Sequence, residues 1–339
     1  MFQFFLALLS LLSLPLITAY SNPNTCSGAC WAHDPAIIQR SSDGKYYKFN
    51  TGGNIEIATA SNLAGPWTLK GFVLNGGSVI DNPGRKDAWA PDVTLVNGIY
   101  HLYYSVSTFG SQVSPTFFFV LSMFFYDLNS AIGLATSATL DPGSWTDKGA
   151  IGVTSSAGKS YNAIDANLIA VGGSYYLNFG SFWHDIYQVK LNAAATKGGG
   201  AAAYNIEYDS TGGSPCEGAY LFYYSGYYYL TWSRGVCCGY DKTKPAPGLE
   251  YRIMMCRSST ATGGFVDKNG RSCSTANGGS VLLESHGDVY GPGGQGVFTD
   301  RSMGLVLYYH YASLKRGLGD GSYLFGWNVL KWSGGWPSV

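Results

Sequence analysis

The chain has 339 residues, of which only 12% are charged, and its 21 basic residues balance its 21 acidic ones. This neutral composition excludes the basic surface of a nucleic-acid-binding protein and the cationic face of an anchor for anionic membranes. We therefore expect a neutral partner, no nucleic acid and no membrane.

Residues 1–19 form the first predicted element. They contain the run FFLALLSLLSLPLI, which is apolar, too short to span a bilayer and followed by small residues, as in a secretory signal. A buried N-terminal helix is the alternative, but Pro15 would end it. We predict a signal peptide over 1–19 and a secreted, extracellular protein. No charged, Pro-rich or Gly/Ser-rich linker divides residues 20–339, so one domain is expected there.

Seven cysteines in a secreted chain allow at most three disulfides and leave one thiol over. Cys26 and Cys30 are close enough in sequence to pair with each other. The adjacent Cys237 and Cys238 can form a vicinal bridge or pair elsewhere, so the connectivity stays open. A zinc site is the competing interpretation, but the chain has neither two CxxC pairs nor an HExxH motif.

Five repeats follow one another, each with a short strand, a tight turn, a Tyr-rich strand and a further strand. They begin near Asp34, Pro91, Asp165, Glu217 and Gly291. The 26 Tyr, 17 Phe, 9 Trp and 46 Gly residues favour such strands and turns over helices. Repeats of about 50 residues are typical of propeller blades. We predict an all-β fold, a five-bladed β-propeller; a jelly roll or β-sandwich is the alternative, but it would not place acids at the repeat starts.

Four acidic residues stand at the starts of the first four repeats: Asp34, Asp92, Asp165 and Glu217. The first strand of a blade lies nearest to the propeller axis, so these side chains should meet at one mouth of the central channel. Clustered carboxyl groups push their pKa values apart, which lets one act as an acid and another as a base at the same pH. Each acid taken alone can equally accept backbone hydrogen bonds in a turn.

Aromatic residues flank these acids. They are Trp31, Trp89, Phe109, Phe182 and Trp183. Flat apolar faces beside hydrogen-bonding groups suit sugar rings, although in so aromatic a chain most such residues must be ordinary blade packing.

Several motifs then carry a resemblance to a known family. They are TCSGACWAHDPAI from Thr25, WAPDV from Trp89, YNAID from Tyr161, FGSFW from Phe179, CEGAY from Cys216, CCGYD from Cys237 and YGPGGQGV from Tyr290. On these motifs the chain resembles glycoside hydrolase family 43, specifically its fungal secreted endo-α-1,5-L-arabinanases, over almost the whole mature chain. The resemblance implies endo-hydrolysis of linear arabinan, a side chain of pectin, and of arabino-oligosaccharides. It also implies inversion of the anomeric configuration, a monomer and no required cofactor.

The resemblance also assigns roles to single residues. Asp34 matches the general base, Glu217 the general acid, and Asp165 the carboxylate that orients the acid and tunes its pKa, which leaves Asp92 with a structural role. The carboxyl groups of an inverting pair lie about 6.5–9.5 Å apart, so that a water fits between them. Positions that line the family's substrate cleft match Trp89, Phe109, Asn162 and Ser181.

The chain departs from the family in two places. Many relatives have proline where this chain has Ala166, after Asp165. Bacterial relatives carry a histidine near a central cation, in the slot that Gln295 takes here. His310 is then the candidate metal ligand, for one structural calcium or sodium ion on the propeller axis. A buried structural histidine is the alternative.

Other functions stay open at this point. Within the enzyme class, an exo-acting α-L-arabinofuranosidase or β-xylosidase is the alternative, because an open groove permits endo cutting and a blocked one exo cutting. Outside it stand an inactive arabinan-binding propeller and a purely structural one. Three intact acids argue against both.

Residues 113–128, VSPTFFFVLSMFFYDL, interrupt the match, since relatives read directly from Gln112 into Asn129. So Phe-rich a stretch would expose a large apolar patch. A lid over the cleft, a membrane or partner anchor and a translated intron are the competing interpretations. The run is too short to span a bilayer. Val-Ser at its start can be encoded by the usual opening bases of an intron, and Tyr-Asp-Leu at its end by a sequence like a branch point. Its Phe codons would form a pyrimidine-rich tract. We therefore favour the retained intron.

Overall fold

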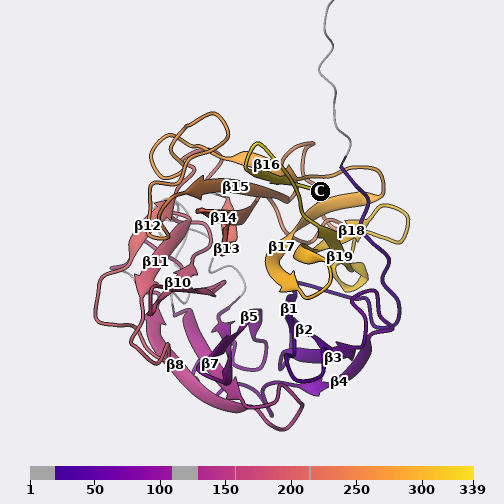
Figure 1. Ribbon diagram of the computed structural model, residues 1–339, viewed down its shortest axis with the longest axis vertical. Helices are drawn as coiled ribbons and strands as arrows, with labels where there is room; N and C mark the ends of the chain where they lie inside the picture. Colours follow the sequence, from indigo (N-terminus) through magenta and orange to yellow (C-terminus); the bar gives the residue numbers. More distant parts are fainter. Residues whose placement is uncertain (1–19, 109–128, 157, 214) are drawn as a thin grey trace, which may run out of the picture.

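The computed structural model describes residues 20–108, 129–156, 158–213 and 215–339. Within them, five antiparallel sheets of three or four strands stand around a central axis in chain order (Figure 1). The predicted five-bladed β-propeller is therefore confirmed. The predicted signal peptide over 1–19, the insertion 113–128 and Phe109 lie outside the described residues.

Each blade is a meander whose strands are hydrogen-bonded in sequence order. The first blade contains β1 (Ala36–Gln39), β2 (Tyr46–Asn50), β3 (Glu56–Ala60) and β4 (Thr68–Phe72). The second contains β5 (Trp89–Val96), β6 (Ile99–Val106), β7 (Ala131–Ser137) and β8 (Thr146–Thr154). The third contains β9 (Asn167–Val171), β10 (Ser174–Phe179), β11 (Ile186–Lys190) and β12 (Tyr204–Glu207). The fourth contains β13 (Cys216–Tyr224), β14 (Tyr227–Arg234), β15 (Arg252–Ser258) and β16 (Ser280–Leu283).

The fifth blade has three strands and is followed by a C-terminal hairpin. The blade contains β17 (Val289–Asp300), β18 (Gly304–Ser313) and β19 (Leu324–Val329), and the hairpin contains β20 (Lys331–Ser333) and β21 (Trp336–Ser338). One 3-10 turn, η2 (Asp320–Ser322), is the only helical element of the described chain. None of the described residues forms a helix long and apolar enough to cross a membrane.

The N-terminal segment closes the ring against the fifth blade, which the sequence did not predict. The backbone N–H of Asn24 donates to the carbonyl of Trp327 at 3.0 Å, and that of Phe325 donates to the carbonyl of Cys30 at 2.8 Å. In Figure 1 this segment runs down beside β18 and β19. The first and last parts of the chain therefore share one blade, and the edge of β19 is covered.

Apolar clusters fill the spaces between neighbouring blades. Between the first two blades, for example, Tyr47 and Phe49 pack with Leu102 and Tyr104, all fully buried. Further clusters join the second blade to the third, the third to the fourth, the fourth to the fifth and the fifth to the first. Burial of each large side chain contributes about 1.5–3 kcal/mol, so the blade interfaces supply the main stabilisation of the ring.

The cysteines form three disulfides: Cys26–Cys30, Cys237–Cys238 and Cys256–Cys273. Cys26 therefore pairs with Cys30 as the spacing allowed, and Cys237 and Cys238 form the vicinal bridge instead of pairing elsewhere. The cysteine left over is Cys216, whose thiol is buried next to the inner edge of the fourth blade.

Each inner strand has a residue in the left-handed backbone region, either two residues before its start or within its first half. Asp34, Ala90 and Asp165 have φ values of 41°, 44° and 59°, and Gly218 and Gly294 have 62° and 55°. Register shifts in β5, β13 and β17 accompany these residues. Such bulges bend a strand and turn its side chains, here at one mouth of the axis.

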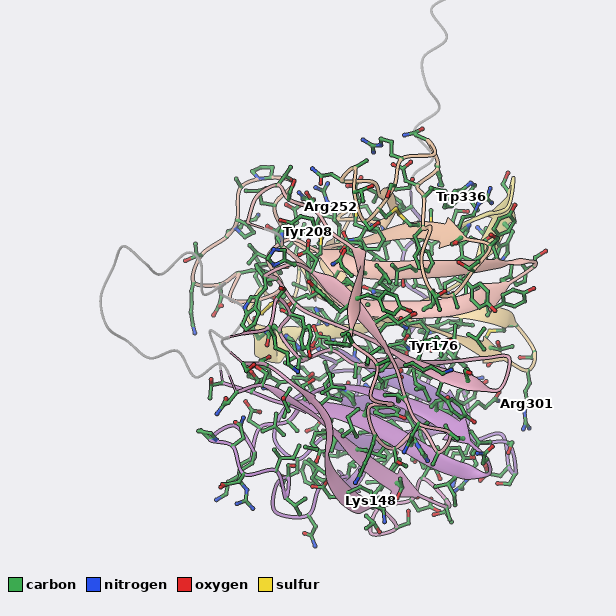
Figure 2. All side chains as sticks on the ribbon, turned by 90° about the vertical axis from the view of Figure 1, so that its left-hand side faces the viewer. Lys148, Tyr176, Tyr208, Arg252, Arg301 and Trp336 are labelled. Carbon is green, nitrogen blue, oxygen red and sulfur yellow. A yellow bond between two sulfur atoms is a disulfide. The ribbon has the colours of Figure 1, made fainter. Side chains whose placement is uncertain are left out.

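The four acids were expected at equivalent positions at the repeat starts, but they do not occupy the same position relative to the left-handed residue of each blade. Asp34 and Asp165 occupy the left-handed position itself, Glu217 precedes it by one residue, and Asp92 follows it by two. Non-glycine residues in this backbone region are costly and cluster at functional sites. In the side view of Figure 2 the strands run from one face of the propeller to the other, and Arg301, in the turn between β17 and β18, lies at one of these faces.

Candidate active site

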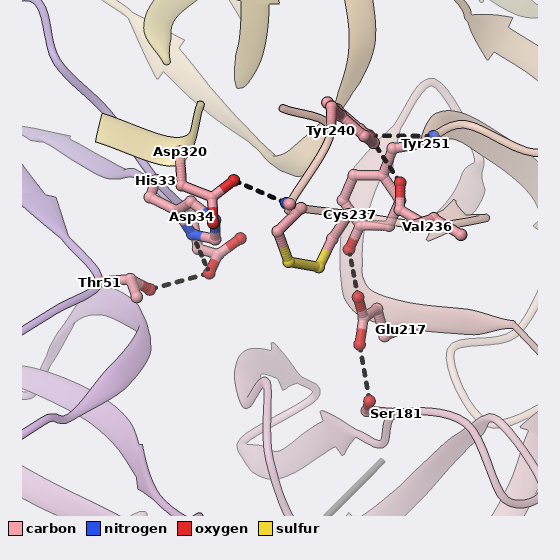
Figure 3. Close-up of a disulfide and its surroundings, with 12 residues drawn as sticks. His33, Asp34, Thr51, Ser181, Glu217, Val236, Cys237, Tyr240, Tyr251 and Asp320 are labelled. Atoms are coloured by element: carbon pink, nitrogen blue, oxygen red, sulfur yellow. Dashed lines mark hydrogen bonds and ion pairs between the residues drawn. A yellow bond between two sulfur atoms is a disulfide. The ribbon is translucent and has the colours of Figure 1, made fainter. Parts of the chain in front are cut away.

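The starts of the inner strands surround one cavity at a mouth of the axis. Its lining includes the carboxyl groups of Asp34, Asp92, Asp165 and Glu217, the aromatic rings of Trp89 and Tyr220, and the Cys237–Cys238 disulfide. Figure 3 shows the part of the site around that disulfide. Residues from all five blades contribute to the lining, so the cavity exists only when the ring is closed.

Asp34 is held as an ionised acceptor. Its Oδ2 lies 3.0 Å from Nδ1 of His33 and accepts the Thr51 hydroxyl at 2.8 Å (Figure 3). Burial favours its neutral form, but the adjacent His33, then His310 and the Thr51 hydroxyl, outweigh it and hold the pKa of Asp34 below its usual range. The side chain keeps 23% of its surface exposed. A carboxylate that is charged and open to water suits a general base.

Glu217 is held as a proton donor. It is 9% exposed, and its Oε2 and Oε1 accept the hydroxyls of Ser181 at 2.6 Å and Tyr251 at 2.8 Å. Burial raises the pKa of Glu217, and the negative charge of Asp34 raises it further, while the two hydroxyls oppose the shift. The carboxyl group therefore keeps its proton to higher pH than an exposed glutamate, as a general acid requires.

Asp165 lies beside Glu217 and is hydrogen-bonded to the backbone of the residue that follows it. Its Oδ2 accepts the N–H of Gly218 at 3.2 Å, and its own N–H donates to the Ser105 hydroxyl at 3.0 Å. Burial, followed by the charges of Glu217 and Asp34, raises the pKa of Asp165 well above its usual range. Asp165 and Glu217 thus titrate as a coupled pair, in which a charge on one carboxyl group disfavours a charge on the other.

The turn after Glu217 is supported from the fifth blade. Nε2 of Gln295 donates to the carbonyl of Gly218 at 2.7 Å, and Oε1 of Gln295 accepts the Ser233 hydroxyl at 2.6 Å. The same Ser233 oxygen accepts the N–H of Gly294 at 2.9 Å. Gln295 therefore holds the backbone next to Glu217.

Gly294 is required where the fifth blade passes Asp34. A Cβ at this position would lie 2.4 Å from Oδ1 of Asp34 and 2.6 Å from Nδ1 of His310. Its φ of 55° also disfavours any other residue. The glycine-rich motif thus makes room for the side chains of Asp34 and His310.

His310 is fully buried at the axis and stacks on His33, with 4.6 Å between the ring centroids. Its Nδ1 accepts the backbone N–H of Asp34 at 3.0 Å, whereas its buried Nε2 has no partner in the described chain. Burial, followed by the charge of His33, lowers the pKa of His310 to about 3, against the opposing effect of Asp34. The ring is therefore neutral.

Asp92 makes structural contacts although it borders the cavity. Its Oδ2 accepts the backbone N–H of Leu168 at 2.9 Å and the side-chain amide of Asn167 at 3.4 Å. These bonds join the second blade to the third. Burial, partly offset by these bonds, raises the pKa of Asp92 to about 6.

A model of the glycosyl hydrolases family 43 matches residues 26–337. The chain belongs to this family. It is 56% identical to a probable arabinan endo-1,5-alpha-L-arabinosidase A from Neosartorya fischeri, over 96% of this chain and 95% of that protein. It is 54% identical to arabinan endo-1,5-alpha-L-arabinosidase A from Aspergillus aculeatus, over 98% of this chain and 99% of that protein.

Solved family 43 structures share the fold. A family 43 endo-arabinanase from Bacillus licheniformis superposes with a TM-score of 0.77 at 30% identity, over 93% of this chain and 99% of that one. An exo-1,5-alpha-L-arabinanase from a bovine ruminal metagenomic library gives a TM-score of 0.76 at 28% identity, over 91% and 96%. The propeller is therefore common to endo- and exo-acting proteins.

In this family 43 hydrolase the structure brings most of the sequence-predicted residues together. Asp34, Asp165, Glu217, Trp89 and Ser181 all line the cavity. Asn162 is placed elsewhere: its side chain is fully buried, outside the lining, and accepts the Ser155 hydroxyl at 3.2 Å. Phe109 falls outside the described residues.

Sequence reasoning missed the groups that set the charge of the two carboxyl groups. His33 stands in the quoted HDPAI motif, directly before Asp34, so its proximity could have been noticed. Thr51 directly follows β2 and Tyr251 directly precedes β15, and neither carries a sequence signal. The quoted CCGYD motif contains Cys237 and Cys238, but nothing in it indicates that they face the cavity.

Proposed function

We propose that this hydrolase cuts α-1,5-L-arabinofuranosidic bonds within linear arabinan and inverts the anomeric configuration. The observation that carries the proposal is the opposite displacement of two pKa values in one cavity, downward for Asp34 and upward for Glu217. The fungal relatives named as arabinan endo-1,5-alpha-L-arabinosidases support the substrate.

The chemistry is a single displacement. Asp34 takes a proton from a water molecule, whose oxygen forms a bond to the anomeric carbon on the face opposite the leaving group. Glu217 gives its proton to the glycosidic oxygen as the bond from that oxygen to the anomeric carbon breaks. Asp34 then loses its proton to solvent and Glu217 regains one.

The remaining site residues orient these two groups. Asp165 fixes the backbone after Glu217 and places a second carboxyl group beside it, which keeps the proton on the acid. Ser181 and Tyr251 fix the plane of the Glu217 carboxyl group through its two oxygens. Trp89, at the cavity wall, and Phe109 are proposed to contact sugar rings, and Asn162 to support the loop that leads to Asp165.

Digestion of debranched arabinan tests the function. An endo-acting enzyme lowers the viscosity of the polymer before many reducing ends appear, and arabino-oligosaccharides precede free arabinose. Release of arabinose with little early change in viscosity would favour the exo-acting alternative. Binding to arabinan without any release of reducing ends would favour an inactive arabinan-binding propeller.

We further propose His310 as the residue that would hold an axial calcium or sodium ion. A cation at the buried Nε2 would need the ring proton on Nδ1, which faces Oδ1 of Asp34 at 3.4 Å, as in carboxylate–histidine–metal arrangements. Binding would therefore cost the hydrogen bond that Nδ1 accepts from the Asp34 N–H. A bound cation would supply positive charge near the base. Melting temperatures of chelator-dialysed protein, with and without added calcium or sodium, test this; identical values would rule the cation out.

We also infer that the chain is secreted as a monomer, that residues 1–19 are its signal peptide and that residues 113–128 are absent from the mature enzyme. Peptide mass mapping of the secreted protein tests the two segments together. The expected N-terminal peptide begins near Tyr20, and a peptide containing residues 117–119 would contradict the retained intron. Loss of activity on deletion of 113–128 from recombinant protein would favour a lid instead.

A further inference from the structure

The vicinal disulfide Cys237–Cys238 lines the same cavity as the catalytic carboxyl groups. In Figure 3 its sulfur–sulfur bond points into the space between Asp34 on one side and Glu217 on the other. Neither cysteine takes part in the proton transfers described above. A disulfide between adjacent residues closes a small ring whose side-chain atoms are carbon and sulfur alone, so it presents a soft, polarizable surface without a hydrogen-bond donor.

The loop that carries this disulfide is fixed by hydrogen bonds to the fifth blade and by one within the loop itself. The Tyr323 hydroxyl donates to the carbonyl of Cys237 at 3.1 Å, and the N–H of Gly239 donates to Oδ1 of Asp320 at 2.8 Å. Within the loop, the Tyr240 hydroxyl donates to the carbonyl of Val236 at 2.6 Å. The disulfide is therefore a preorganised surface, which binds a ligand without first losing conformational entropy.

The rest of the cavity explains why such a surface is needed. Around the reacting bond the wall is polar, with the carboxyl groups of Asp34 and Glu217 and the hydroxyl of Ser181. These groups can bind the hydroxyl edge of a sugar. The C–H face of the same ring has no hydrogen bonds to offer and binds best against an apolar surface.

We propose that the Cys237–Cys238 disulfide is the apolar wall of the subsite that holds the arabinofuranose ring under attack, with the C–H face of that ring packed against the two sulfur atoms. This inference rests on the proposed function, because the ring whose anomeric carbon lies between base and acid is the ring that faces the disulfide. Both cysteines then act in substrate positioning and not in redox chemistry.

Binding in a hydrolysis-deficient background tests the subsite. Glu217→Gln is the parent, and the dissociation constant of arabinopentaose is measured by calorimetry for the parent and for the parent with Cys237→Ala and Cys238→Ala. Loss of the contact with one sugar face should raise the dissociation constant roughly tenfold. The pair Cys237→Ser and Cys238→Ser, which puts hydroxyls in place of the sulfur surface, should weaken binding at least as much and serves if the alanine pair does not fold.

Two matched controls separate the wall from its surroundings. Cys26→Ala with Cys30→Ala removes a disulfide that does not line the cavity, and should leave the dissociation constant within about twofold of the parent. Tyr323→Phe keeps the disulfide but removes the hydroxyl that fixes the Cys237 carbonyl, and should have a smaller effect than the loss of both sulfurs.

The outcomes are distinct. If the parent does not bind arabinopentaose, the proposed function fails. If the parent binds and the alanine and serine pairs bind equally well, the function stands and the subsite is overturned. If Tyr323→Phe weakens binding as much as removal of the disulfide, the position of the loop and not its sulfur surface sets affinity, which also overturns the inference.

Discussion

Substitution of Glu217 should give a loss of activity that depends on the leaving group, whereas substitution of Asp34 should give a loss that does not. Glu217→Gln preserves the shape of the side chain, and its amide can still pair with the hydroxyls of Ser181 and Tyr251, so the fold should survive. On arabinan this variant lacks the proton for the leaving oxygen. General acid catalysis contributes about 10²–10⁴-fold, or roughly 2.7–5.4 kcal/mol of the barrier, and activity should fall by that factor.

An aryl α-L-arabinobioside with an acidic phenol as leaving group needs no such proton. On this substrate Glu217→Gln should retain activity within about tenfold of the natural enzyme. Asp34→Asn should lose about 10²–10⁴-fold on both substrates, because the attacking water needs its base in either case. Initial rates of reducing-end and phenol release measure the two reactions. Equal losses for Glu217→Gln on both substrates, or an Asp34→Asn variant that is spared on the aryl substrate, would refute the assignment of acid and base.

Three further variants test the electrostatics of the site and of the blades. Asp165→Asn removes the carboxyl group that competes with Glu217 for a proton, so the pKa of Glu217 should fall. The alkaline limb of the pH profile of kcat/KM should then move to lower pH. A limb that does not move would contradict the role of Asp165 in tuning the pKa of Glu217. Asp92→Asn should reduce kcat less than either catalytic substitution, since Asp92 bonds to the backbone of the third blade, and a loss as large as that of Asp34→Asn would place it in the chemistry. Glu207→Gln concerns a fully buried carboxyl group, whose pKa is raised well above the usual range by burial and then by the charges of Asp185 and Asp209, while a hydrogen bond with the Cys216 thiol opposes the shift. A raised folded-state pKa contributes stability that is complete below the unfolded-state pKa, about 4.3, and is lost as pH rises through the folded-state pKa. The melting temperature of Glu207→Gln relative to that of the natural enzyme should therefore increase from acid to alkaline pH. A difference that stays constant with pH would show that Glu207 does not titrate.

The blades and the three central acids could be predicted from the sequence because they follow from local pattern. Alternating Tyr-rich segments and Gly turns predict strands, and the recurrence of the pattern predicts the ring. The positions of Asp34, Asp165 and Glu217 at strand starts then place them at the axis. Their opposite roles came from the family resemblance, and the environments of Asp34 and Glu217 now give a physical reason for them.

The parts that could not be predicted depend on contacts between distant segments. Nothing near Tyr251 in the sequence indicates that its hydroxyl reaches Glu217, which is 34 positions away and in another strand. The closure of the ring by Asn24 and Cys30 on β19 joins residues about 300 positions apart. The bulges that shift Asp92 two residues from the register of Asp34 arise from left-handed backbone at Ala90, a residue type that gives no warning of it.

The stereochemistry of the first product tests the single displacement at Asp34 and Glu217 most directly. Proton NMR of an arabinan or arabinopentaose digest, recorded before the new reducing end equilibrates, distinguishes its two anomers. Direct attack by water on an α-linked ring, without a covalent sugar intermediate, predicts that the β-anomer appears first. Appearance of the α-anomer first would contradict the proposed mechanism, because retention requires a nucleophile on the enzyme in place of the base.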